Sequence, residues 1–245
     1  MISKAKIKFI KSLQIKKYRK QEQCFVVEGA KSVQELITSS YEPLMVIGMP
    51  AFLDGIRPLI ANKEVELTEA GEAELAAMGS FQSNTTGLAV ARMKPNTPVE
   101  VKQGEYALAL DDLRDPGNVG TIIRIADWYG INKIIASAET ADFYNPKVVT
   151  ASMGSFTRVQ FYYTELSAYL VGTTLPVFGA FLDGENIHQT TFGVEGIVVV
   201  GNESNGISAD VGATVTRRIT IPRFGRGESL NAAIATAIIC DNLRR

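Results

Sequence analysis

The sequence predicts two α/β domains, and three observations lead to this prediction. Short apolar runs alternate with helix-like segments along the chain of 245 residues. The alternation is interrupted by a polar, proline-containing stretch at 93–105, which is typical of a linker. Hydrophobic residues make up 46% of the chain, enough for a sizeable buried core. We therefore place one domain at residues 1–94, a linker at 95–104 and a larger domain at 105–245.

The first domain is expected to begin with a basic, helical stretch at 3–20. It contains eight Lys and Arg residues and no acid, while Ile7, Ile10 and Leu13 are spaced to share one helix face. Because the whole chain has a formal net charge of −1, we interpret this cationic stretch as a contact for phosphates. The alternative is a solvated helix packed on its own domain. The elements expected next are strands at 24–29, 43–49 and 87–93 and helices at 30–39 and 67–79.

The second domain repeats the alternation more regularly. Strands are expected at 106–112, 133–138, 175–181, 196–203 and 217–223, and helices at 118–130, 145–155 and 229–245. This order implies a parallel sheet with helices on its faces. The alternation alone would favour a doubly wound nucleotide-binding fold.

The composition excludes several classes of function. Cys24 and Cys240 are the only cysteines, too few for a disulfide framework or a thiolate metal cage. A single histidine, His188, is too few for a histidine-based metal centre, and we expect no metal. The chain opens with neither an apolar signal core nor a spanning segment, so we expect a cytoplasmic protein without a membrane partner.

Polar loops that contain glycine follow three of the expected strands, and the carboxyl ends of parallel strands form the usual ligand crevice. In the first loop, a helix is expected to begin near Asn118, which could be a plain N-cap. Arg124 would then lie near the helix start, where the helix dipole disfavours a cation unless it meets an anion. We therefore interpret Arg124 as a contact for a ligand or a phosphate.

The other two loops follow the strands at 196–203 and 217–223. Gly201 comes directly after an apolar strand, where a glycine lets a ligand approach the backbone; the alternative is a tight turn. Ser229 stands at the start of the last helix and could merely cap it. Three such loops at one sheet edge favour a single ligand site.

Together, DPGNVGTIIRIAD, VGNESNGIS and IPRFGRGESLNAAIA resemble, in order, the three motifs of the SpoU/TrmH family of RNA 2′-O-ribose methyltransferases. The resemblance spans residues 105–245, and KYRKQEQCFVVEGAKSVQEL is similar to the substrate-binding domain of many members. It implies a small α/β RNA substrate-binding domain followed by a parallel-sheet domain with a trefoil knot. It also implies S-adenosylmethionine as cofactor, RNA as substrate and a homodimer with the active site near the subunit interface.

The resemblance also implies roles for individual residues. Backbone contacts to the adenosine of the cofactor are implied for Gly201, Ile221 and Leu230. The polar catalytic set that it implies consists of Asn118, Arg124, Glu203, Ser229 and Asn231. Because a guanidinium is not deprotonated in proteins, we expect Arg124 to hold an RNA phosphate beside the reacting hydroxyl rather than to act as a general base.

The third motif departs from the family pattern at two positions. Arg223 stands where an apolar residue is common, and Ala232 replaces a frequent valine. Arg223 and Arg226 make this loop basic, which bears on how RNA enters. Lys147 and Arg158 are expected to be ordinary exposed charges.

Several alternatives remain at this stage. Within the family, the target is a ribose in ribosomal or transfer RNA, or a base; the additional N-terminal domain favours ribosomal RNA. A catalytically silent RNA-binding protein would have the same fold. A dinucleotide enzyme is disfavoured, because no GxGxxG follows the strand at 106–112.

Overall fold

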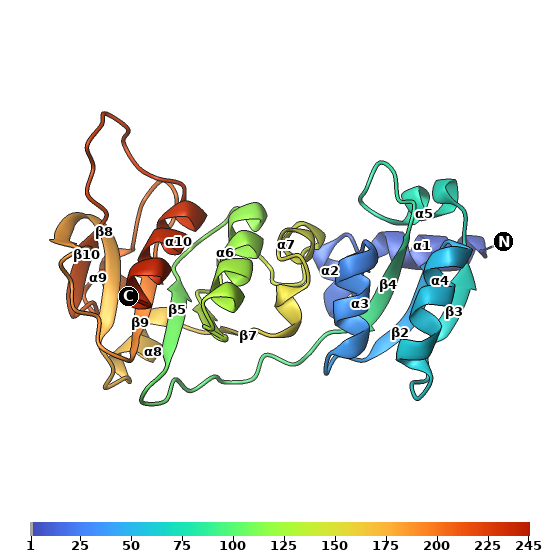
Figure 1. Cartoon of the computed structure of the whole chain (residues 1–245), viewed down its shortest axis with the longest axis horizontal. Coiled ribbons are helices and arrows are strands. Elements are labelled where there is room, and N and C mark those ends of the chain that lie inside the picture. Colours follow the sequence, from blue (N-terminus) through green and yellow to red (C-terminus); the bar gives the residue numbers. More distant parts are fainter. Residues whose placement is uncertain (1) are drawn as a thin grey trace. The chain divides into compact units, whose positions relative to one another are not determined.

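The computed structural model describes residues 2–245 and divides the chain into two compact units (Figure 1). The first unit comprises Met1–Pro95 and Asp142–Thr157, and the second comprises Asn96–Ala141 and Arg158–Arg245. A short segment from the middle of the chain thus belongs to the first unit. Within the described residues, no helix is long and apolar enough to cross a membrane.

The first unit is built on a mixed four-stranded sheet of order β1-β4-β2-β3. Its strands are β1 (Cys24–Glu28), β2 (Pro43–Gly48), β3 (Glu66–Glu69) and β4 (Gly87–Arg92). Its helices are α1 (Lys4–Ser12), α2 (Lys16–Glu22), α3 (Ala30–Thr38), α4 (Pro50–Ile56), η1 (Arg57–Ile60), α5 (Glu72–Met78), α7 (Pro146–Ala151) and η2 (Ser155–Thr157). Ile10 and Leu13 are fully buried with Leu75 of α5 and Val26 of β1 in one apolar core, so α1 and α5 cover the same sheet face.

Two expectations for this unit were wrong in detail. The basic stretch at 3–20 forms two helices, because the chain turns between Leu13 and Ile15. The segment 67–79 is not one helix: Glu66–Glu69 pairs with β2, and the helix begins at Glu72. Pairing with β2 satisfies backbone N–H and C=O groups of Glu66–Glu69, and this tertiary interaction overrides the local helix propensity. The short helix α4, which begins with Pro50, was not foreseen.

The second unit contains a six-stranded sheet of order β10-β8-β9-β5-β6-β7, in which every neighbouring pair is parallel. Its strands are β5 (Tyr106–Leu110), β6 (Lys133–Ala136), β7 (Gln160–Tyr163), β8 (Val177–Asn186), β9 (Gly196–Val200) and β10 (Arg217–Thr220). Its helices are α6 (Pro116–Trp128), α8 (Leu166–Val171), α9 (Ala209–Gly212) and α10 (Ala232–Leu243). The predicted parallel-sheet domain preceded by an α/β domain is therefore confirmed, while β7, α8 and α9 were not foreseen.

The central strands β5 and β9 are buried along their whole length, which explains their continuous apolar sequences. Ala107 of β5 and Val199 of β9 pack with Leu170 of α8 and Val211 of α9 on one face. Figure 1 shows α6 and α10 side by side, and these two helices are in contact. The helices thus pack on the sheet. The polar side chains gather in the loops at the carboxyl ends of its strands.

An ion pair in the first unit joins the N-terminal helices to the segment Asp142–Thr157. Arg19 Nη2 lies 2.6 Å from Asp142 Oδ2, and Arg19 Nη1 donates to the carbonyls of Leu13 and Gln14 at 2.8 and 2.9 Å. The Arg19 side chain is 1% exposed and that of Asp142 is 13% exposed. Removing one partner of such a pair leaves a buried charge without compensation.

We predict that Asp142→Ala lowers the free energy of unfolding by about 3 kcal/mol, the cost of leaving Arg19 buried and unpaired. Urea denaturation followed by circular dichroism measures it. The matched control is Asp54→Ala, which removes the partner of the exposed Arg57 and should change stability by less than about 0.5 kcal/mol. Equal effects of the two variants would contradict the structural role assigned to Asp142.

Candidate active site

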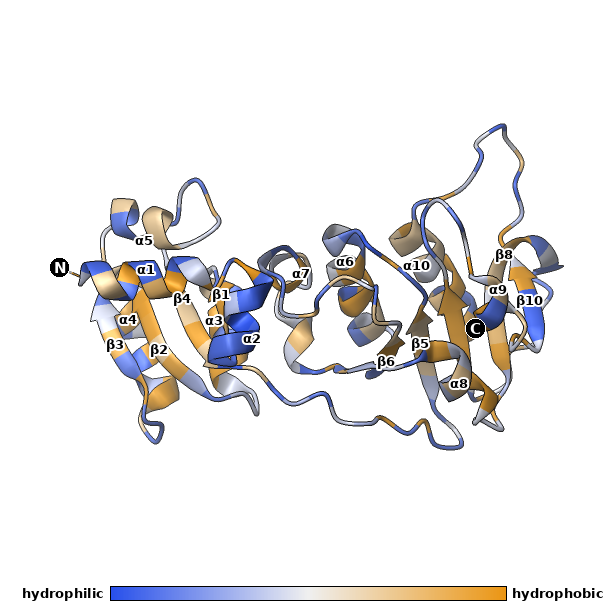
Figure 2. Cartoon of the chain, turned by 180° about the vertical axis from the view of Figure 1, so that it is seen from behind, coloured by the Kyte–Doolittle hydropathy of each residue, from blue (hydrophilic) through white to orange (hydrophobic). Residues whose placement is uncertain are grey.

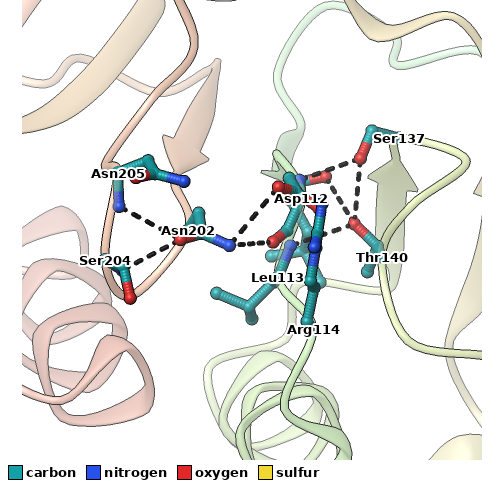
Figure 3. Close-up of polar contacts among 9 residues, drawn as sticks. Asp112, Leu113, Arg114, Ser137, Thr140, Asn202, Ser204 and Asn205 are labelled. Carbon is teal, nitrogen blue, oxygen red and sulfur yellow. Dashed lines mark hydrogen bonds and ion pairs between the residues drawn. The ribbon is translucent and has the colours of Figure 1, made fainter.

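The loops that follow β5, β6 and β9 are joined by hydrogen bonds (Figure 3). The Asp112 backbone N–H donates to Ser137 Oγ at 2.8 Å, and Asn202 Nδ2 donates to the Asp112 carbonyl at 2.7 Å. Asp112 has a φ of 54°, a left-handed conformation that is uncommon for a non-glycine residue. These bonds to two neighbouring loops hold Asp112 in that conformation.

Asn202 also shapes its own loop. Its Oδ1 accepts hydrogen bonds from the backbone N–H groups of Ser204 and Asn205, as Figure 3 shows. A second hydrogen bond joins the loops after β5 and β9: the Ser208 N–H donates to Oδ2 of the buried Asp111 at 2.7 Å. The sequence analysis gave no role to Asp111 or Asp112, and it placed Asn202 only as part of the motif VGNESNGIS. The signal for Asp111 and Asp112 was that they follow an apolar strand.

Three residues of the predicted polar set form a continuous chain of hydrogen bonds. Asn231 Nδ2 donates to Asn118 Oδ1, and Asn118 Nδ2 donates to Glu203 Oε1, each at 2.9 Å. Asn231 Oδ1 accepts from the N–H groups of Ala233 and Ile234 and so caps α10. The three motif loops, from distant parts of the sequence, thus meet at one edge of the sheet.

Arg124 and Ser229 do not join this chain. Both are exposed, and within residues 2–245 neither side chain has a hydrogen-bond or ion-pair partner. Ser229 lies in the exposed loop between β10 and α10, and Asn231 rather than Ser229 caps α10.

The expectation for the start of α6 was wrong. Asp115 caps the helix by accepting from the Asn118 N–H at 2.7 Å, and α6 therefore begins at Pro116. Arg124 is consequently past the middle of a 13-residue helix, where the dipole does not disfavour a cation. What distinguishes Arg124 is instead that its guanidinium is exposed and unpaired.

The three residues expected to hold adenosine differ in their surroundings. A Cβ at Gly201 would lie 2.3 Å from the backbone of Gly206 and Ile207, so the glycine is required by the folding back of its own loop. This favours the tight turn as the reason for a glycine at this position, and a backbone contact of Gly201 to a ligand stays a prediction. Ile221 is half-buried, and Leu230 is 51% exposed.

The exposed backbone at Leu230 fits an adenosine. Among the described residues, its N–H and C=O have no partner, so both can bond a purine edge, and the side chain can contact the ring.

The cysteines do not contribute a nucleophile. Burial raises the pKa of the Cys24 thiol, and it raises the pKa of Cys240 to about 12. Both thiols are therefore protonated near neutral pH. The groups that remain at the site are amides, a carboxylate, a hydroxyl and a guanidinium, which suit the binding and orientation of a polar substrate.

The SpoU rRNA Methylase family model matches residues 105–241, and the MRM3-like substrate binding domain model matches residues 4–89. The chain belongs to the SpoU rRNA methylase family. This confirms the resemblance seen in the three motifs and the prediction of an S-adenosylmethionine-dependent RNA methyltransferase.

A curated relative, the 23S rRNA (guanosine(2553)-2′-O)-methyltransferase RlmP of Bacillus subtilis, is 28% identical over 98% of this chain and 96% of its own. Another, the 23S rRNA (uridine(2479)-2′-O)-methyltransferase of Streptomyces viridochromogenes, is 28% identical over 60% of this chain and 55% of its own. The chain thus spans nearly the full length of the first relative and about half of the second.

Solved structures share the fold over the whole chain. One from Porphyromonas gingivalis, whose description assigns it to RNA methyltransferases of the TrmH family, is 37% identical, covers 99% of this chain and 98% of its own, and has a TM-score of 0.86. An AdoMet-bound rRNA methyltransferase from Sinorhizobium meliloti is 24% identical, covers 100% of this chain and 95% of its own, and has a TM-score of 0.89. The second likeness concerns the fold alone.

We predict that Asn118→Ala makes local opening of the N-terminus of α10 more frequent, because the Asn231 side-chain amide loses the acceptor that orients it. Amide hydrogen exchange at Ala233 and Ile234 should be roughly fivefold faster, as expected from the loss of one hydrogen bond of about 1 kcal/mol. The control is Thr121→Ala, since among the described residues Thr121 Oγ1 bonds only to the Gly117 carbonyl of the same helix. Unchanged exchange in Asn118→Ala would show that the chain of hydrogen bonds does not restrain α10.

Proposed function

We propose that this protein transfers a methyl group from S-adenosylmethionine to a ribose 2′-hydroxyl of ribosomal RNA. The observation that carries the proposal is the hydrogen-bonded chain from Asn231 through Asn118 to Glu203, which gathers the three family motifs at one sheet edge. Ribosomal RNA is favoured over transfer RNA because RlmP of Bacillus subtilis, similar over nearly the whole length, carries a 23S rRNA substrate in its name.

The cofactor would be held by the loops after β9 and β10. The backbones of Gly201, Ile221 and Leu230 would contact the adenosine, and the unpaired polar groups of Leu230 fit this role. When bound, S-adenosylmethionine supplies an electrophilic methyl group on a sulfonium. The residues of this chain then have two tasks, to align the attacking oxygen and to assist the departure of its proton.

Arg124 would hold the RNA phosphate next to the reacting ribose. A guanidinium binds a phosphate through two parallel hydrogen bonds, and an exposed, unpaired one needs to break no contact to do so. Its positive charge would lower the pKa of the nearby 2′-hydroxyl, whose proton passes to a phosphate oxygen or to water. Arg124 itself stays protonated throughout.

The remaining polar residues would orient the reactants. Asn118, Asn231 and Ser229 would position the ribose or the methionine end of the cofactor. Glu203 would order the loops rather than abstract the proton, because its Oε1 already accepts from Asn118. Side chains that are already held in place lower the entropic cost of aligning the reactants.

The proposal includes the finer features that the family resemblance implies. These are a homodimer, a trefoil knot in the second unit, a cytoplasmic location, and a division into a substrate-binding domain at 1–94, a linker at 95–104 and a methyltransferase domain at 105–245. The homodimer is supported by exposed apolar side chains on α6, on α10 and in the loop between β10 and α10, which a partner surface would cover. They are Trp128, Phe224, Leu230 and Ile234.

The reaction is tested by mapping 2′-O-methylated riboses in total RNA from cells with and without the gene. We expect one ribosomal position to lose its methyl group in the deletion strain and to regain it on complementation. A lost mark confined to transfer RNA would overturn the ribosomal assignment, and an unchanged methylation map would overturn the proposed reaction.

We predict that Arg124→Lys lowers kcat by about 100-fold or more, the usual cost of losing one preorganised group that stabilises the transition state. A lysine keeps the charge and loses the bidentate geometry. Cofactor affinity, measured by calorimetry, should be unchanged. The control is Arg57→Lys, an exposed arginine of the first unit, and near-normal turnover of Arg124→Lys would refute the assigned role.

A further inference from the structure

Two successive helices of the first unit carry exposed lysines that lack acidic partners. We call this set, distributed over α1 and α2, the α1–α2 lysines: Lys4, Lys8, Lys11, Lys16, Lys17 and Lys20. Among residues 2–245, none of the six forms an ion pair, whereas Lys6 of α1 pairs with Glu66 of β3. Figure 2 shows α2 as hydrophilic beside the apolar strands of the sheet.

The positive charge of the first unit is concentrated at these helices. Residues 1–23 hold eight of the 25 Lys and Arg residues of the chain but only one of its 26 Asp and Glu residues. The rest of the unit, 24–95 and 142–157, holds six basic and ten acidic residues. A polyanion is therefore attracted to α1 and α2 more than to the rest of the unit, whose net charge is negative.

Three of the six lysines lie where a helix dipole is unfavourable for a cation, whereas Lys11 and Lys20 lie in last turns, where it is favourable. Lys4 lies in the first turn of α1, Lys16 and Lys17 lie in the first turn of α2, and neither first turn contains an acid. Helix dipoles disfavour cations there. Lys4 and Lys8, like Lys16 and Lys20, are also four residues apart, a spacing at which like charges repel. Phosphates bound to these lysines would relieve both effects.

The apolar face of α1 is not available to a membrane. Ile10 and Leu13 are fully buried in the core of the first unit, so α1 cannot insert an apolar face into a bilayer. The apolar groups that remain exposed beside the lysines are Ile15, at 54%, and Tyr18, at 38%. An exposed aromatic ring among lysines is the arrangement with which proteins stack unpaired bases.

We propose that α1 and α2 bind an unpaired segment of the substrate RNA, with the α1–α2 lysines on its phosphates and Tyr18 stacked on a base. The inference rests on the proposed function, because it names the surface that holds the substrate of that reaction. It assigns RNA binding to one surface of the region that matches the MRM3-like substrate binding domain, residues 4–89.

The first test compares the full-length protein with the variant Lys16→Gln/Lys17→Gln/Lys20→Gln in binding a labelled 20-nucleotide polyuridine. We expect the Kd to rise roughly tenfold, and the slope of log Kd against log salt concentration to fall by about 2, since each phosphate contact on a single strand contributes about 0.7. The control, Lys31→Gln/Lys63→Gln/Lys102→Gln, removes the same charge from exposed lysines elsewhere. Identical Kd values and slopes in the two variants would overturn the proposal.

A second test addresses the stacking. Tyr18→Ala should weaken polyuridine binding roughly tenfold, and Tyr18→Phe should retain the affinity because the ring is kept. Thermal melting verifies that both variants are folded. An unchanged Kd for polyuridine in Tyr18→Ala would contradict the stacking of Tyr18 on a base. Binding to phosphatidylserine vesicles that outcompetes polyuridine would replace RNA by a membrane surface and overturn the proposal as a whole.

A separate readout distinguishes this inference from the proposed function. The lysine variant should keep its calorimetric affinity for S-adenosylmethionine and its kcat at saturating RNA, while its KM for RNA rises. A wild-type protein that binds no S-adenosylmethionine would refute the proposed reaction and leave the polyuridine result standing. A lysine variant with unchanged KM would refute the RNA surface and leave the reaction standing.

Discussion

The candidate site depends on the hydrogen bonds that run from Asn231 through Asn118 to Glu203. The residues they join are 113 and 85 positions apart along the chain. A primary amide suits this central place because it donates and accepts at the same time. Asn118 lies in α6, whose first turn is held by the Asp115 cap. The loops that contain Glu203 and Asn231 are thus both fixed by hydrogen bonds to one helix, α6.

The polar residues around the candidate site fall into two groups. In the first group, Asn202 and Asp111 join the loop after β5 to the loop after β9 through structural hydrogen bonds. Arg124 and Ser229 are exposed and have no partner among residues 2–245. Groups without internal bonds can bind a substrate without first giving up a contact. The first group thus makes the loops rigid, and the unpaired groups are accessible to a ligand.

The first unit shows that a compact unit need not follow the order of the chain. Segment Asp142–Thr157, which lies between β6 and β7 in sequence, packs its Phe156 and Tyr144 against Phe25 of β1. The Arg19–Asp142 pair joins the same segment to α2. The stability of the first unit thus depends on residues within the range 105–241 that matches the SpoU rRNA Methylase model.

Local patterns were sufficient for most strands and helices, because a continuous apolar run such as β9 and a capped helix such as α10 are specified by neighbouring residues. They failed where partners are distant. Glu66–Glu69 becomes a strand only because β2 lies beside it, and the start of α6 depended on whether Asp115 or Asn118 was the cap. The motif residues were recognised by their order and not from their contacts.

By itself, the sequence determined the α/β class, the parallel sheet of the second unit and the family, because periodicity and motif order are properties of the chain alone. The tertiary structure decided which polar residues meet. In the folded protein, Asn118, Glu203 and Asn231 are joined by hydrogen bonds, whereas Arg124 and Ser229 have no partner among residues 2–245. A glycine is required at position 201 because the loop folds back against it. Such contacts link residues far apart in sequence, and their geometry is set only when the sheet brings its loops to a common edge.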